Sequence, residues 1–192
     1  MEKLNEAEQL VTLSIKAYVR DLEAMESKIF AYTETLGHIA QQLDVYFNVP
    51  YGQLKLRKTH PSKEHAELIS SKSVSHSSNL VETRSTHIQE ASALRKTLEL
   101  CITELGSIKK KRRVYVKDNV RINLDDVEDV GVFVDIEIKK DGSHDVDKKA
   151  EEVRKALGIT EDIVVSSTYL ELYRKQKSAD SGFDDETSDA SV

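Results

Sequence analysis

The sequence has little cysteine and no long apolar segment, and both shortages exclude certain classes of protein. Its single cysteine, Cys101, cannot form an intramolecular disulfide. Cys101 lies among Leu98, Leu100 and Ile102 on a predicted helix, which favours a buried thiol over a reactive nucleophile. No apolar run approaches the roughly 18 residues of a membrane span, and no charged start precedes an apolar stretch, so we expect neither a span nor a secretory signal. We therefore expect a cytoplasmic protein, with the nucleus as an alternative.

Glycine is also sparse, and none of the 7 glycines belongs to a phosphate-binding loop motif. Any phosphate would therefore have to be bound by side chains. The 6 histidines are scattered and lack the spacing of a metal site. The basic run at 109–113 (KKKRR) alternates within a predicted strand, and the domain has no net basic surface. Nucleic-acid binding is therefore not favoured.

The composition predicts one folded domain with polar ends. With 39% apolar residues in 192, the chain suits a single domain that has a substantial core. We assign this domain to residues 10–174, after a polar leader at 1–9. The last segment, 175–192, is rich in Asp, Glu and Ser and is expected to be disordered. Residues 178–192 contain five acids and no base, so the formal net charge of −6 becomes −1 without them and the rest of the chain is nearly neutral.

Three predicted strands just beyond the middle of the chain carry charged faces. Residues two apart lie on the same face of a strand, which puts Lys110 and Arg112 together in the first. The second strand presents Arg121 and the third presents Asp135 and Glu137, each opposite a face of apolar residues. The polar faces thus combine both signs of charge.

These charged faces have two interpretations. Carboxylate oxygens bind Mg²⁺ or Mn²⁺, while guanidinium and ammonium groups neutralise phosphate oxygens, so the pattern suits a site for a metal-bound polyanion. A solvated sheet face with cross-strand ion pairs would show the same alternation. Lys55 and Arg57, two apart on an earlier predicted strand, could likewise form a binding site or an exposed basic edge.

Six segments resemble the CYTH family, the triphosphate tunnel enzymes that include class IV adenylyl cyclases and thiamine triphosphatases. The segments are 42–50 (QLDVYFNVP), 54–57 (LKLR), 108–112 (IKKKR), 121–137 (RINLDDVEDVGVFVDIE), 156–159 (ALGI) and 168–172 (TYLEL). Their order and spacing agree with the family's pattern, and the resemblance covers about residues 10–173. It implies an α+β fold, namely an eight-stranded antiparallel β-barrel with flanking helices.

The resemblance also implies a function and a set of site residues. The implied activity is metal-dependent hydrolysis of a triphosphate, either inorganic tripolyphosphate or a small organic triphosphate. Lys16 and Arg112 would be catalytic, and Asp135 with Glu137 would bind Mg²⁺ or Mn²⁺. The residues that would contact the substrate are Lys16, Lys55, Arg57, Lys110, Arg112 and Arg121. The sequence leaves the oligomeric state open.

The first predicted strand departs from the family's pattern. The family carries Glu-x-Glu-x-Lys there, whereas this chain has Thr12, Ser14 and Lys16. A hydroxyl is a weak neutral ligand, so Asp135 and Glu137 would hold the metal nearly alone.

A second departure is the serine-rich segment 70–79, which stands where the family has an aromatic-rich stretch ending in a tunnel arginine. Lys72 could substitute for that arginine. Because of both departures, the alternative function is a catalytically inactive family member that binds a phosphorylated ligand or serves as an interaction scaffold.

Periodicity and capping residues predict the remaining elements. Strands are expected at 10–19, 38–48, 53–58, 66–69 and 80–89, a short strand or extended piece at 163–165, and helices at 22–35, 90–105, 145–157 and 167–174. Asp21 and Asp145 are the predicted N-caps, and Gly37 and Gly158 the predicted ends, of two of these helices.

Overall fold

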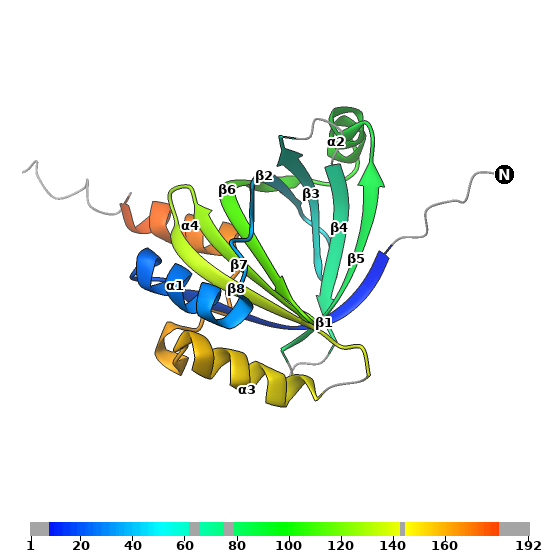
Figure 1. Ribbon diagram of the computed structural model, residues 1–192. Helices are drawn as coiled ribbons and strands as arrows, with labels where there is room; N and C mark the ends of the chain where they lie inside the picture. Colours follow the sequence, from blue (N-terminus) through cyan, green and yellow to red (C-terminus); the bar gives the residue numbers. More distant parts are fainter. Residues whose placement is uncertain (1–7, 62–65, 75–78, 143–144, 181–192) are drawn as a thin grey trace, which may run out of the picture.

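The computed structural model describes residues 8–61, 66–74, 79–142 and 145–180. Its strands are β1 (Glu8–Tyr18), β2 (His38–Phe47), β3 (Gln53–His60), β4 (Ala66–Ser73), β5 (Leu80–Ile88), β6 (Glu104–Lys117), β7 (Val120–Val127) and β8 (Gly131–Lys139). They form a closed antiparallel barrel in the order β1-β5-β4-β3-β2-β6-β7-β8, which confirms the predicted fold (Figure 1). Most of the predicted leader, and the predicted tail beyond residue 180, lie outside the described residues.

The barrel turns its polar strand faces inward and its apolar faces outward. On β7 and β8, Ile122, Val134 and Ile136 are fully buried beneath helices outside the barrel. Asp135 and Glu137, which alternate with them on β8, face the interior. Neighbours along a strand project to opposite sides, so the sequence pattern requires this division. The largest hydrophobic core therefore lies between barrel and helices, and the interior is left to polar side chains.

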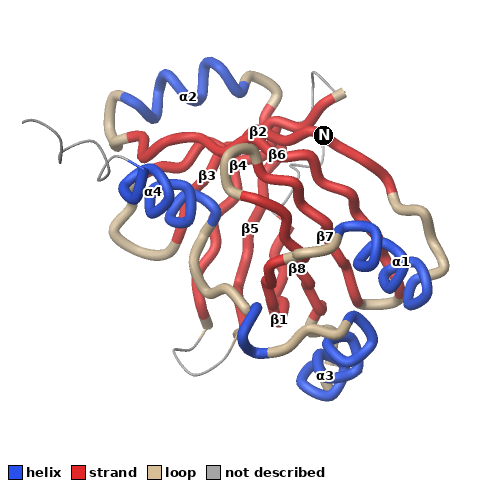
Figure 2. Tube along the Cα trace, turned by 90° about the vertical axis from the view of Figure 1, so that its left-hand side faces the viewer, coloured by secondary structure: helices blue, strands red, loops and turns tan. Residues whose placement is uncertain are grey.

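The helices are α1 (Leu22–Thr33), α2 (Ala91–Glu99), α3 (Val146–Leu157) and α4 (Tyr169–Asp180), with a 3₁₀ turn at Glu161–Ile163. Helices α1 and α3 lie side by side outside the barrel, where α1 packs against β6 and α3 against β1 and β8 (Figure 2). The Asp21 carboxylate accepts a hydrogen bond from a backbone N–H in the first turn of α1, and Asp145 does the same for α3. Both predicted N-caps are confirmed.

The two helices differ in how they end. Helix α3 ends at Gly158, which adopts the predicted left-handed conformation with φ of 69°. Helix α1 ends instead at Glu34, with φ of 57°, and not at Gly37 as predicted. Gly37 lies next to the start of β2, where a Cβ would come within 2.7 Å of the Val114 carbonyl oxygen. Its role is close approach to β6, not capping.

Helix α2 covers the outside of β2 and β3 and is shorter than predicted. It ends at Glu99 because the chain enters β6 at Glu104, which pairs with Phe47 of β2. Cys101 consequently falls in an exposed turn, beside Leu100, which is 88% exposed. The predicted buried thiol is therefore wrong.

The segment after α3 returns to the barrel. The strand predicted at 163–165 is in part the 3₁₀ turn, and Val164 makes an isolated bridge to Ala17 of β1. Helix α4 begins at Tyr169, whose side chain lines the barrel interior, and extends six residues past the predicted end at 174. Within the described ranges, no helix is long and apolar enough to cross a membrane.

Candidate functional site

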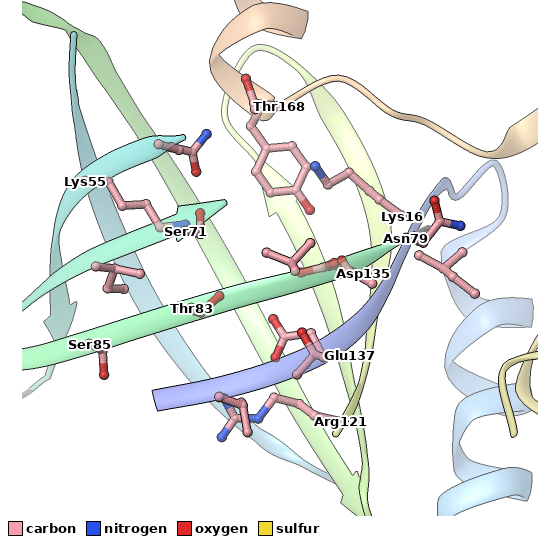
Figure 3. A pocket seen from close by; sticks show the side chains of 18 of the residues that line it. Lys16, Lys55, Ser71, Asn79, Thr83, Ser85, Arg121, Asp135, Glu137 and Thr168 are labelled. Atoms are coloured by element: carbon pink, nitrogen blue, oxygen red, sulfur yellow. The ribbon is translucent and has the colours of Figure 1, made fainter. Parts of the chain in front are cut away.

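The barrel interior holds a polar cavity of about 840 Å³. Its lining includes the eight residues predicted to bind substrate or metal: Lys16, Lys55, Arg57, Lys110, Arg112, Arg121, Asp135 and Glu137. Figure 3 shows Lys55, Asp135 and Glu137 directed into this space. Ion pairs do form among these residues, as expected for a charged sheet face. However, Lys110, Arg112 and Asp135 are buried in the cavity wall, so they do not belong to a solvated outer surface.

One carboxylate, that of Asp44 on β2, joins three of these cations. Arg57 Nε and Nη2 donate to Asp44 Oδ1 and Oδ2, both at 2.7 Å. Lys110 Nζ donates to Oδ2 at 2.7 Å, and Lys55 Nζ lies 3.6 Å from the same oxygen. Burial alone would raise the pKa of Asp44, but the three cations hold it well below its usual value. Asp44 is therefore a permanent counter-ion inside the wall.

Burial acts in the opposite direction on the two lysines of this cluster. Removal from water disfavours the charged amine, which lowers the pKa of Lys110 to about 7 and that of Lys55 to about 8. The Asp44 carboxylate opposes this decrease, while the neighbouring guanidinium groups of Arg57 and Arg112 add to it. Near neutral pH the charge of both lysines therefore depends on Asp44.

A second buried cluster is centred on Arg112 of β6. Its Nε and Nη2 donate to the two carboxylate oxygens of Asp125 at 2.7 and 2.6 Å, and Nη2 lies 3.3 Å from Asp135 Oδ2. Tyr169, at the start of α4, donates its hydroxyl to Asp125 at 2.8 Å. Burial would lower the pKa of Arg112, but the surrounding carboxylates raise it well above its usual value. The guanidinium group is therefore charged and fixed in direction.

Asp135 and Glu137 project into the cavity from β8. Across β1, Lys16 is the partner of Asp135 and Ser14 is the partner of Glu137. Burial, reinforced by the nearby Asp135, raises the pKa of Glu137. Two neighbouring carboxylates resist simultaneous ionisation, and a bound cation would relieve that repulsion.

The acid pair fits a divalent cation when other ligands contribute. No group of three His, Cys, Asp or Glu able to hold a metal occurs in the part of the chain that the structure describes. The amide oxygen of Asn123, whose register partner on β8 is Asp135, is buried without a hydrogen-bond partner among the described residues. Mg²⁺ commonly takes one or two carboxylates and completes its shell with water and substrate phosphates. The residues therefore fit a metal that arrives with a phosphate ligand.

The two remaining predicted cations flank this acid pair. Lys16 Nζ donates to the Ser167 carbonyl at 3.1 Å and lies 4.5 Å from the centroid of the Tyr169 ring. Arg121 on β7 is the register partner of Glu137, and its side chain is exposed. Lys16 is thus held by the segment that leads into α4, whereas Arg121 lies where the cavity meets solvent.

The wall formed by β1, β4 and β5 is largely neutral. Its inward positions carry the hydroxyls of Thr12, Ser14, Ser71, Thr83 and Ser85 (Figure 3). Lys72, the suggested replacement for the family arginine, points away from the cavity, because its Nζ pairs with Glu82 at 3.2 Å and its side chain is 64% exposed. That suggestion is wrong, and the cations are concentrated on β3 and β6 instead.

Sequence reasoning missed Asp44, Asp125 and Tyr169 as site residues. All three lie in segments that resemble the family, and alternation places Asp125 on the same face as Arg121. That signal marks an inward acid but does not identify its partners, which come from other strands. The pairing of Asp44 with Lys110 joins residues 66 positions apart.

Comparison with known proteins identifies the family. The sequence model of the CYTH domain family matches residues 14–169 of this chain. The chain belongs to the CYTH family. A Methanocaldococcus jannaschii protein, provisionally named an adenylate cyclase, is 35% identical over 77 residues, which are 38% of this chain and 44% of that relative. The alignment thus spans less than half the length of the relative.

Solved structures of similar proteins share the fold of this CYTH chain. A Pyrococcus horikoshii protein is 26% identical with a TM-score of 0.76, covering 84% of this chain and 98% of that one. A Pyrococcus furiosus protein is 28% identical with a TM-score of 0.74, covering 86% and 99%. The Hippeastrum protein HpAC1 is 13% identical with a TM-score of 0.60, covering 87% and 96%, and shares the fold alone.

Proposed function

We propose that this CYTH chain binds a triphosphate in the barrel cavity and hydrolyses it slowly with a divalent metal. The observation that carries the proposal is the convergence of Lys16, Lys55, Arg57, Lys110, Arg112 and Arg121 on one cavity that also contains the acid pair Asp135 and Glu137. Guanidinium and ammonium groups neutralise phosphate oxygens. At about 840 Å³, the cavity falls within the range of roughly 300–1,000 Å³ typical of ligand pockets. It therefore has room for an organic group beside the phosphates.

The geometry supports separate roles for the residues. Lys16, held by Ser167 and Tyr169, would contact a phosphate from the β1 side. Arg112 would neutralise charge that develops on the transferred phosphoryl group. Asp135 and Glu137 would hold Mg²⁺ or Mn²⁺ delivered with the ligand, and the bound metal would polarise the phosphoryl group and lower the pKa of a coordinated water.

The composition of the first strand, β1, favours slow turnover or binding without turnover. Thr12 and Ser14 line the cavity where the family pattern has glutamates, so two potential metal ligands are replaced by neutral hydroxyls. HpAC1, described as having a dominant triphosphatase activity, shares only the fold with this chain. A protein that binds a phosphorylated ligand without hydrolysing it is therefore the second candidate function.

The deciding experiment is phosphate release from tripolyphosphate, ATP and thiamine triphosphate by the purified chain with Mg²⁺ or Mn²⁺. The Asp135→Ala/Glu137→Ala variant should lose turnover. The matched control is Asp126→Ala/Glu128→Ala, which removes two exposed acids from the end of β7 and the turn before β8. This control should keep turnover.

The outcomes separate the two functions. Turnover that disappears only in the cavity variant supports the hydrolase. Calorimetric binding of a triphosphate without phosphate release supports the binding protein. Absence of both binding and release with all three compounds would refute both.

A further inference from the structure

The position of Asp44 in the barrel wall suggests a role beyond charge balance. Asp44 lies on β2, between the two strands that supply most of the cavity's cations, β3 and β6. Its carboxylate is fully buried, and its two oxygens contact Arg57, Lys110 and Lys55 at 2.7, 2.7 and 3.6 Å. Asp44 therefore holds Arg57, its register partner on β3, and also contacts Lys55 from β3 and Lys110 from β6.

The charges of this group still favour an anion. When its lysines are protonated, three positive charges surround one negative charge, so the group retains a net positive charge toward the cavity. Lys55 and Arg57 keep 17% and 12% of their side chains exposed, whereas Asp44 has none. The acid lies behind the cations, and a ligand in the cavity meets the cations first.

Without Asp44, this cluster would lose the acid that contacts all three of its cations. Lys110 faces Asp44 on β2, Lys55 and Arg57 on β3, Arg112 on its own strand and the Tyr169 ring, 5.7 Å away, on α4. Asp44 is the acid that contacts both lysines, and its attraction opposes the decrease in their pKa values. Asp125 also attracts Lys110, and Asp135 also attracts Lys55. Its loss would leave mutually repelling cations in a poorly solvated wall.

We infer that Asp44 is a positioning residue of the anion site, which keeps Lys55 and Lys110 charged and directs Arg57 into the cavity. Replacement of this negative residue by a neutral one then weakens anion binding instead of strengthening it. The inference rests on the proposed function, because it assumes that the cavity binds a polyphosphate. It opposes the simple Coulomb expectation, in which removal of an acid from an anion site raises affinity.

The test is calorimetric titration of the full chain with inorganic tripolyphosphate, without added metal, at several pH values from about 6 to about 9. The Asp44→Asn variant should bind at least about tenfold more weakly than the wild type near pH 7. As the pH rises, the affinity of the variant should also begin to decrease about one pH unit below the point at which the wild type's does, because its lysines lose their protons at lower pH. The control Asp126→Asn, an exposed acid on β7, should bind as the wild type does.

A second variant covers the case in which Asp44→Asn fails to fold. Asp44→Asn/Lys110→Met removes one charge of each sign, so the net charge of the cavity is unchanged. We expect weaker binding than by Lys110→Met alone, since Arg57 has lost its anchor, whereas affinity equal to or above that of Lys110→Met would overturn the inference. Equal or tighter binding by Asp44→Asn, or an unshifted pH dependence, would also overturn it. Failure of the wild type to bind tripolyphosphate would instead reject the proposed function, and the inference with it.

Discussion

Ser14 on β1 lies directly across from Glu137 on β8, so a hydroxyl faces a half-buried carboxylate at the acidic end of the cavity. Thr12, two residues earlier, lines the same wall with 6% of its surface exposed. Because both side chains point inward, acids placed here would face the same space as Glu137. The metal site is therefore weakened at two positions, Thr12 and Ser14, which supply hydroxyls in place of carboxylates.

Conversion of both positions to glutamate should strengthen the metal site. We expect Thr12→Glu/Ser14→Glu to raise metal-dependent triphosphate hydrolysis by more than about tenfold, because added carboxylates increase the charge and number of metal ligands. Phosphate release with Mg²⁺ or Mn²⁺ measures the change, with the exposed substitution Thr86→Glu on β5 as the control. An unchanged rate in a folded double variant would show that the cavity is altered elsewhere.

The Arg112–Asp125 pair should be important for stability. Asp125→Ala leaves a buried guanidinium without its main partner, and loss of one member of a buried pair costs about 3–5 kcal/mol of unfolding free energy. The double variant Arg112→Met/Asp125→Leu should lose less, since no unpaired guanidinium remains at this position. Urea denaturation measures both changes.

An exposed pair serves as the comparison for that experiment. Lys109 and Glu128 are 3.7 Å apart with side chains 66% and 59% exposed. Glu128→Ala should therefore change stability little, since exposed pairs contribute below about 1 kcal/mol. If Asp125→Ala were as mild as Glu128→Ala, the buried cluster would not hold the barrel together as the structure indicates.

Burial of Lys110 predicts a pH-dependent stability. Its pKa falls from the ordinary 10.5 to about 7, so between these pH values the unfolded chain binds more protons than the folded chain. Stability then rises with pH, because the cost of burying the charged amine is present below about pH 7 and disappears toward 10.5. Wild type should gain stability relative to Lys110→Met across this window in urea titrations. Parallel curves for the two proteins would contradict the assignment.

Exposure of Cys101 predicts ready modification of the native protein. The thiol lies in the turn after α2 and is exposed, so a thiol reagent such as Ellman's should react stoichiometrically without denaturant. Cys101→Ser should show no reaction and should keep phosphate binding, since this turn does not line the cavity. Reaction that required urea would restore the buried thiol expected from the sequence.

Local pattern was a good guide wherever one strand or one helix end decided the outcome. Alternation predicted that Lys110 and Arg112 share a face, and the N-caps Asp21 and Asp145 are as expected. Pattern failed where a neighbouring element intervened. Helix α2 stops early because β6 begins pairing with β2 at Glu104, which no helical periodicity could reveal.

The sequence by itself determined the strand faces, the helix starts and the family, because these depend on two-residue and four-residue spacings and on motifs that are continuous in the chain. Only the tertiary structure decided which side chains of the cavity lie next to one another. Closure of the barrel brings β2 beside β6 and β1 beside β8, so Asp44 reaches Lys110 and Ser14 faces Glu137. The register between strands distant in sequence is set by the whole closed sheet, and no single segment contains that information.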